Sequence, residues 1–321
     1  MEPAERERDG NVARRIPWGL LKLLLVLLIL FFLGRTFVGH LDELRGTEFC
    51  VDPLLLSAGF VLMAVTYLYI ALVWHMLTRE FGVDTLYGES LLKWSGSQFA
   101  RYIPGTVFIL FSRFMSYRDT GYAKKSITAA FLLENLIVAW SALVVFLTFG
   151  WSLIPEGSAL RYVSLLAVPL GAAAVIPGVS RGAANALLGL FGREPISEWP
   201  RTRCMVQCLA LGLLTFLQGG AGFFLMVSSL FPRDIASLPT VIGAFAGSGV
   251  VNLLVFFVPG GLGARDGALA LFLSSLLPVS GAILMAVLCR VAMTLMEAMV
   301  LLSGWVWSRI ARSRRGRSAD A

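Results

Sequence analysis

Apolar residues are concentrated in blocks of about 20 residues, and short polar segments separate the blocks. A helix of about 20 residues crosses a hydrocarbon core of roughly 30 Å. Six blocks are expected to be full membrane spans: residues 18–34, 53–77, 126–150, 162–177, 204–230 and 281–307. The first block could instead be read as a signal peptide, but it is long and no small-residue cleavage site follows it. The pattern predicts an all-α, polytopic membrane helix bundle.

Two further apolar segments are interrupted by proline and glycine. Residues 91–113 contain Pro104 and Gly105, and residues 239–277 contain Pro259, Gly260 and Gly261. Proline removes a backbone donor from a helix and glycine weakens it. We expect each segment to form a broken, re-entrant helical hairpin that dips into the membrane and returns. An ordinary kinked span is the alternative for residues 91–113.

The distribution of Lys and Arg predicts the orientation. Positive residues precede the first span, the loop 39–52 is acidic, and the loop 178–203 and the C-terminal tail are rich in arginine. The positive-inside rule then places both termini in the cytoplasm of a multi-pass cell membrane protein. The first hairpin would enter from the cytoplasm and the second from outside. Together with their neighbouring spans they would form an inverted repeat, and transporters with such repeats bind substrate near the bilayer midplane.

This reading leaves almost no room for a soluble domain. Residues 1–16 are expected to be a disordered cytoplasmic tail, 17–308 a single transmembrane domain, and 309–321 a basic cytoplasmic tail. Only 15% of the residues are charged, against about 25% in soluble domains. The net charge is +7. Because the positive residues flank apolar spans, this charge favours anionic lipid headgroups as partners over nucleic acid.

Several polar side chains lie within or near apolar segments. They are Arg101, Arg113, Glu134, Asn135, Asn252, Arg265, Asp266, Arg290 and Glu297. A charge at the bilayer centre costs at least about 2.5 kcal/mol, so these groups should face a cavity or a partner. Arg290 and Glu297 lie on one helix face about 10 Å apart, too far for a direct pair. A purely structural alternative is that Arg265 pairs with Glu134 or Glu297 and locks the two halves together.

The candidate substrate pathway joins these side chains to the glycines and prolines of the two breaks, Gly263 included. Helix N-termini and arginines both favour phosphate, which suggests an anionic lipid headgroup as substrate. Only His40 and His75 are histidines, and the four cysteines form no C-x-x-C motif. We therefore predict no metal site and no cofactor. No G-x-x-x-x-G-K-[ST] motif occurs, which argues against ATP hydrolysis by this chain.

Residues 259–267, which read PGGLGARDG, resemble the P-G-G-x-G-x-R-E-G signature of the lysylphosphatidylglycerol synthase transmembrane region family. The similarity extends over about residues 17–308, and further positions contribute to it: Tyr102, Ile103, Pro104, Gly105, Arg113, Gly121, Glu134, Arg290 and Gly304. Asp266 stands where the family usually has glutamate, and Asn135 where it often has arginine. The resemblance implies a flippase-like domain without the aminoacyl-transfer domain of the larger synthases.

Members of that family are linked to the movement of aminoacylated phospholipids, polyprenyl-phosphate sugars, hopanoids or other lipids between leaflets. The expected function is therefore a non-enzymatic lipid flippase that moves an anionic or phosphate-bearing lipid. Two alternatives stay open. One is a membrane-embedded glycosyl- or lipid-modifying transferase that uses the same carboxylates. The other is a membrane anchor subunit for a separate lipid-synthesising enzyme.

Overall fold

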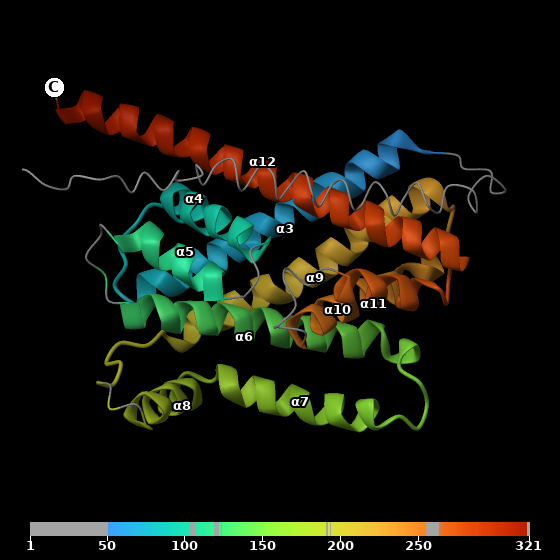
Figure 1. Ribbon diagram of the computed structural model, residues 1–321, viewed down its shortest axis with the longest axis horizontal. Coiled ribbons are helices and arrows are strands. Elements are labelled where there is room, and N and C mark those ends of the chain that lie inside the picture. The colour runs from blue at the N-terminus through green and yellow to red at the C-terminus, as the bar shows by residue number, and fades with distance from the viewer. Residues whose placement is uncertain are drawn as a thin grey trace, which may run out of the picture.

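The computed structural model is built from helices packed roughly along one common direction (Figure 1). It describes residues 51–102, 107–118, 122, 124–190, 192, 194–254 and 263–319. Within these ranges every regular element is a helix. In the same part of the chain, five helices are long and apolar enough to cross a membrane, or six if the bent pair α7 and α8 forms one span. The predicted all-α class is confirmed, and the number of apolar helices is consistent with a multi-pass membrane protein.

Four predicted spans coincide with the longest helices. These are α3 (Pro53–Glu80), α6 (Lys124–Phe149), α9 (Thr202–Leu230) and α12 (Val279–Ala319). The fifth apolar helix is α10 (Leu238–Leu254), preceded by the short turn η4 (Ile235–Ser237). The predicted span 18–34 and the N-terminal tail lie outside the described residues. The predicted C-terminal tail continues α12 as helix to Ala319.

Helices α3 and α9 pack against each other at close range. The Oδ1 atom of Asp52 accepts hydrogen bonds from the backbone N–H groups of Leu54 and Leu55 and so caps α3. A Cβ atom on Gly59 would lie 2.5 Å from the carbonyl oxygen of Gly222. Glycine at both positions lets the two backbones touch, as small residues do in other membrane helix pairs.

Two pairs of helices flank the predicted breaks. α4 (Tyr87–Gln98) continues into η1 (Phe99–Tyr102) and packs against α5 (Val107–Tyr117). α10 packs in the same way against α11 (Ala264–Leu273). The two pairs lie towards opposite ends of the long helices (Figure 1). Pro104, Gly105, Pro259, Gly260 and Gly261 themselves lie outside the described residues.

The segment after the predicted span 162–177 differs from expectation. α7 (Ala159–Val175) meets α8 (Pro177–Leu190) at an angle of 85°. The prediction that residues 178–203 are a loop is therefore wrong for their first half. Proline suits the first position of a helix because the amide there has no helical partner. The side of α8 that packs inward includes Ser180 and Leu188, whereas Arg181 and Leu190 are exposed.

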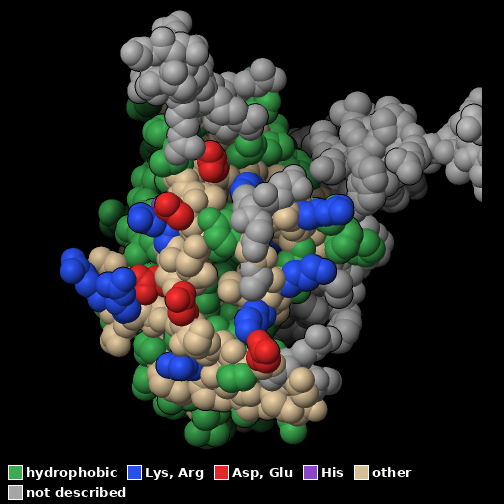
Figure 2. Space-filling view, turned by 90° about the vertical axis from the view of Figure 1, so that its left-hand side faces the viewer, with side chains coloured by type: hydrophobic (Ala, Val, Ile, Leu, Met, Phe, Trp, Pro, Cys, Tyr) green, Lys and Arg blue, Asp and Glu red, His purple; other side chains and the backbone are tan. Residues whose placement is uncertain are grey.

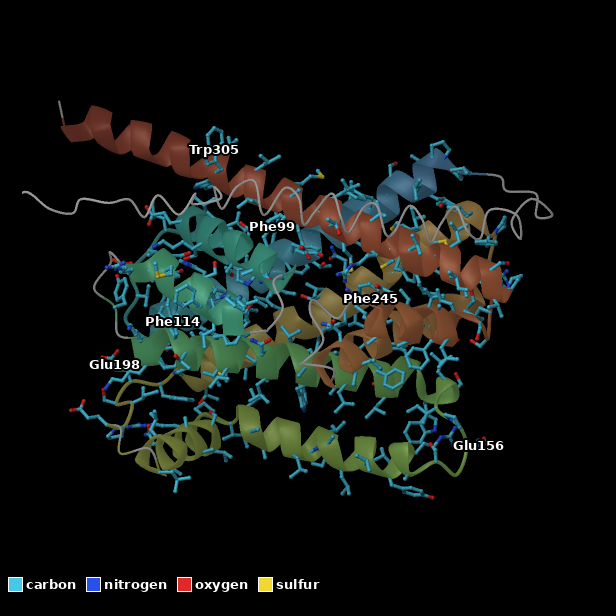
Figure 3. All side chains as sticks on the ribbon, in the orientation of Figure 1. Phe99, Phe114, Glu156, Glu198, Phe245 and Trp305 are labelled. Carbon is cyan, nitrogen blue, oxygen red and sulfur yellow. The ribbon has the colours of Figure 1, made fainter. Side chains whose placement is uncertain are left out.

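Charge and apolar surface are segregated on the outside of the bundle. Large apolar side chains are exposed along the helices, among them Leu54, Val61, Leu132, Leu170, Leu214, Leu271 and Leu302. Figure 2 looks onto the end formed by the last turn of α3, α8 and the start of α9, and charged side chains gather across it. Glu198 lies at this end and Glu156 at the opposite one (Figure 3). Apolar side chains along the helices and charged side chains at an end are the arrangement that a bilayer favours.

Candidate functional site

The centre of the candidate site is a buried ion pair between α5 and α6. Arg113 and Glu134 are only 2% and 4% exposed. The Nη1 atom of Arg113 donates to Oε2 of Glu134, and Nη2 donates to Oε1 at 3.2 Å. This two-pronged geometry is the strongest form of an arginine–carboxylate contact. The sequence marked both residues as candidates, and the structure brings them together.

Neighbouring side chains satisfy the remaining polar atoms of this pair. The Nε atom of Arg113 donates to the Oγ of Ser97 at 3.1 Å. The indole Nε1 of Trp94 donates to Oε1 of Glu134 at 2.7 Å. The guanidinium also lies 4.0 Å from the ring centre of Trp74, a distance at which cation–π attraction is strong. A buried ion pair is tolerated only when its surroundings complete its hydrogen bonds in this way.

Helix α4 provides this polar lining, and its composition explains why. Its buried positions are unusually polar and include Ser90, Ser95, Ser97 and Gln98. The Oγ of Ser95 donates to the carbonyl of Leu91 at 2.7 Å, and the Oγ of Ser97 donates to that of Trp94 at 2.6 Å. Serines that bond back to their own helix can be buried without a partner on another element. The helix can therefore pack inward and still present small polar groups to Arg113.

A second charged group lies at the start of α11. Gly263 precedes this helix with a φ of +87°, a backbone conformation that favours glycine. Asp266 is in the first turn, where a carboxylate interacts favourably with the helix dipole. The Nη1 atom of Arg265 lies 2.7 Å from the Sδ of Met293, and its guanidinium lies 5.5 Å from the ring centre of Phe245. Within the described residues no carboxylate lies within ion-pair distance of Arg265.

Aromatic side chains connect the ion pair to a second buried carboxylate. Glu297 of α12 is 3% exposed, and its Oε1 accepts a hydrogen bond from the Oη of Tyr67 at 3.4 Å. The ring of Tyr67 meets that of Trp94 edge to face, with centres 6.4 Å apart. Trp94 in turn donates to Glu134. We call this chain of contacts, Glu297–Tyr67–Trp94–Glu134–Arg113, the polar line.

The structural alternative raised from the sequence needs correction. Glu134 is occupied by Arg113 and Trp94, not by Arg265. Glu297 accepts a hydrogen bond from Tyr67 of α3, so it contacts a side chain on another helix. Arg290 is 5% exposed and lies on the same helix as Glu297.

The other candidate residues have more local surroundings. The Nδ2 of Asn135 donates to the carbonyl of Phe131, one turn earlier in α6, at 2.8 Å. Asn252 is half-buried near the end of α10. Arg101 lies in η1, next to the first predicted break. The described part of the chain contains no cluster of three or more His, Cys, Asp or Glu side chains that could hold a metal ion.

Sequence reasoning missed the residues that support the pair, namely Tyr67, Trp74, Trp94 and Ser97. One signal was available for two of them. The segment 93–98, which reads KWSGSQ, is mostly polar, although two apolar residues flank it on each side. A short polar stretch with a tryptophan at bilayer depth indicates a lining of buried polar groups. Tyr67 and Trp74 give no such signal, because aromatic residues are common in any membrane span.

Comparison with known proteins does not assign this chain to a family. No protein-family model and no curated protein matches the chain.

Proposed function

We propose that this protein is a lipid flippase that moves an anionic or phosphate-bearing lipid between the leaflets of the cell membrane. The observation that carries the proposal is a set of charged side chains buried inside an apolar helix bundle. Arg113 lies on the short helix α5, next to the first predicted break, whereas Glu134 and Glu297 lie on the long helices α6 and α12. Arg113, Glu134 and Glu297 are each less than 5% exposed. Ionisable groups at this depth are expensive and usually belong to a substrate or ion pathway.

The arrangement of two helix pairs supports a transport mechanism. The pairs α4–α5 and α10–α11 lie towards opposite ends of the bundle (Figure 1). We infer that they are the two re-entrant hairpins of an inverted repeat, with the substrate path between them. The end with Arg79, Lys124, Lys125 and Arg203 would face the cytoplasm, because exposed basic residues gather there. The resemblance to the flippase-like domain family agrees with this proposal.

The charge of the substrate follows from the arginine at the second break. Arg265 is held by a thioether and an aromatic ring. Neither partner neutralises its charge, so a phosphate could replace the contact with Met293 and gain a charge-assisted hydrogen bond. Asp266, the next residue, would balance part of the charge when the site is empty. Arg113 is already neutralised by Glu134 and would hold the pathway wall in place.

The test is reconstitution of the purified protein in liposomes with a fluorescent phosphatidylglycerol in one leaflet. Exposure of the label is followed with a membrane-impermeant quencher. The wild-type protein should move the lipid, and Arg265→Ala should reduce the rate to that of empty liposomes. Arg203→Ala is the matched control, because Arg203 is exposed at the start of α9, away from the polar line.

The assay also separates transport from enzymatic modification. The lipid recovered from the liposomes is analysed by mass spectrometry. An unaltered lipid in the opposite leaflet supports the flippase, whereas a chemically altered lipid supports the transferase alternative. Transport by Arg265→Ala at the wild-type rate would remove this arginine from the mechanism.

A further inference from the structure

Two thiols that are not part of the polar line lie next to each other near the start of α9. Cys204 and Cys208 are four positions apart, so they share one face of the helix. Their Sγ atoms are 3.9 Å apart, a distance that allows only a weak S–H···S hydrogen bond. Both cysteines are free and buried. The helix therefore holds two thiol sulfurs in a fixed position relative to each other.

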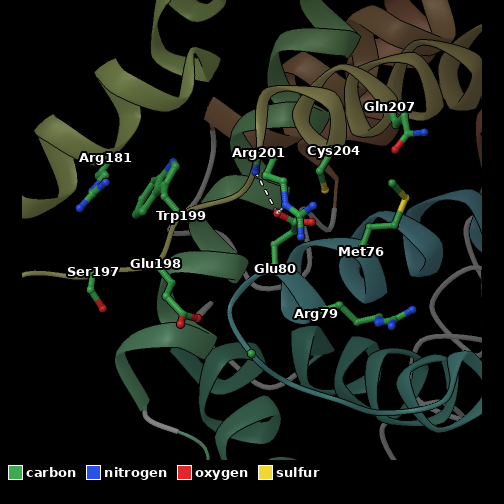
Figure 4. Close-up of a pocket in the computed structure, with 11 residues that line it drawn as sticks. Met76, Arg79, Glu80, Arg181, Ser197, Glu198, Trp199, Arg201, Cys204 and Gln207 are labelled. Atoms are coloured by element: carbon green, nitrogen blue, oxygen red, sulfur yellow. Dashed lines mark hydrogen bonds and ion pairs between the residues drawn. The ribbon is translucent and has the colours of Figure 1, made fainter.

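Cys204 also lines a pocket at the charged end of the bundle. The volume of this pocket is about 720 Å³, and its wall includes Met76 of α3 and Gln207 of α9. Figure 4 shows Cys204 and Met76 extending from their two helices into the pocket. A small ion can thus reach the thiol of Cys204 through the pocket, and the thiol of Cys208 is the next sulfur along the same helix face.

The helices that carry these sulfur atoms are held together at this end. The backbone N–H of Arg201 donates to Oε2 of Glu80 at 3.0 Å, and the Nε of Arg201 lies 3.5 Å from the same oxygen. This contact fixes the start of α9 against the end of α3. The positions of the sulfurs are therefore set before any ligand binds, which lowers the entropic cost of binding.

The distance between the two thiols fits a bridging metal ion better than a disulfide. A disulfide would require the sulfur atoms to approach to about 2.0 Å. Two metal–sulfur bonds of about 2.3 Å that meet at a trigonal angle of about 120° place their sulfur atoms about 4.0 Å apart. The observed 3.9 Å lies close to that value. The pair can thus bind an ion with little movement, and a third ligand position remains.

The available donors favour a soft ion. Thiolate and thioether sulfurs favour Cu(I), whereas structural zinc sites use four ligands. In the part of the chain that the structure describes, no group of three or more His, Cys, Asp or Glu side chains could hold a metal ion, so a zinc site lacks ligands there. The thioether of Met76 lines the same pocket as Cys204 and is available for the third position.

We propose that Cys204, Cys208 and Met76 form a binding site for a soft monovalent cation of the Cu(I) type. Binding releases the two thiol protons to solvent, and two thiolates and one thioether then hold the ion without a change in its oxidation state. The sequence analysis predicted no metal site because C-x-x-C was absent, but C-x-x-x-C on a helix also brings two thiols together. The site is additional to the proposed lipid movement and does not depend on it.

Binding is measured on the purified full-length protein in detergent, without oxygen and with a reductant present. Cu(I) is supplied as its coloured complex with bathocuproine disulfonate, and the loss of colour reports transfer to the protein. The wild type should take up a single ion per chain. Cys204→Ser and Cys208→Ser should each weaken binding more than about 100-fold, because loss of the outer partners of a metal ligand alone costs about 10–100-fold in affinity.

The matched control removes the other two cysteines of the chain. Cys50→Ser/Cys289→Ser should bind Cu(I) as the wild type does, since Cys289 is buried in α12 and Cys50 lies outside the described residues. No uptake by the wild type, unchanged affinity in both single variants, or an equal loss in the control would overturn the site. Circular dichroism confirms that each variant keeps its helical content.

A further variant tests the third ligand. Met76→Leu removes the thioether but keeps an apolar side chain of similar size. Its affinity for Cu(I) should fall about tenfold, and X-ray absorption at the copper edge should show only sulfur neighbours in the wild type. Unchanged affinity would remove Met76 from the site. Nitrogen or oxygen neighbours around the copper would contradict the all-sulfur site.

Discussion

Arg113 and Arg265 each lie on the second helix of a pair that flanks a predicted break, α4–α5 and α10–α11, yet their surroundings differ. Arg113 is 2% exposed and forms a two-pronged ion pair with Glu134. Arg265 is half-buried and contacts a methionine sulfur and a phenylalanine ring. An arginine whose charge and N–H donors are all paired stabilises one conformation. An arginine with weak partners can exchange these partners for a ligand. The difference suggests that one pair anchors the bundle and the other meets the substrate.

The largest expected effect is the loss of stability when Arg113, the fully paired arginine, is removed. Arg113→Ala leaves Glu134 buried without its cation, and breaking such a pair costs about 3–5 kcal/mol. The free energy of unfolding should fall by that amount, measured by denaturation in mixed detergent micelles. Arg265→Ala should cost only about 1 kcal/mol, because it removes one cation–π contact and one weak hydrogen bond.

A double variant distinguishes a buried charge from lost packing. Replacing both partners, as in Arg113→Met/Glu134→Met, leaves no unpaired charge and should recover much of the loss. Some loss should persist, because Trp94 then has no acceptor for its indole N–H. Equal destabilisation by Arg113→Ala and Arg265→Ala would show that the two arginines have the same role.

The next effect concerns Trp94, which connects the Arg113–Glu134 pair to Tyr67. Trp94→Phe keeps an aromatic ring beside Tyr67 but removes the donor to Glu134. A hydrogen bond to a charged group contributes about 1.5–3 kcal/mol, so unfolding should become easier by that amount. The same denaturation assay measures it. Trp305→Phe is the control, because Trp305 is 50% exposed on α12, outside the polar line.

The long helices were the easiest part of this architecture to predict. Residues 53–77, 126–150 and 204–230 correspond closely to α3, α6 and α9, because 20 consecutive apolar residues have few other stable arrangements. α8 was missed because it is rich in Gly and Ala and carries Arg181, so its mean hydropathy is low. The spacing of Val179 and Leu190 within it, three and fourteen positions after Ile176, was a helical signal.

The candidate site was predictable in its residues but not in its pairing. Glu134 and Arg113 were identified because charges are rare in apolar segments. Their contact joins two helices across 21 positions of chain, and no periodicity encodes a distance of that kind. The same holds for Tyr67, which reaches Glu297 across 230 positions. Such contacts depend on how the helices pack, which residue spacing alone does not determine.

The smallest effect is expected at the weak partner of Arg265. Met293→Leu keeps the volume and apolar character of the side chain but removes the sulfur that accepts from Nη1. Such a swap usually costs less than about 1.5 kcal/mol, so stability should hardly change in the denaturation assay. Lipid movement in liposomes should persist, because the charge of Arg265 remains. A large loss of stability in Met293→Leu would contradict the comparison, since it would mean that Arg265 depends on its sulfur contact as firmly as Arg113 depends on Glu134.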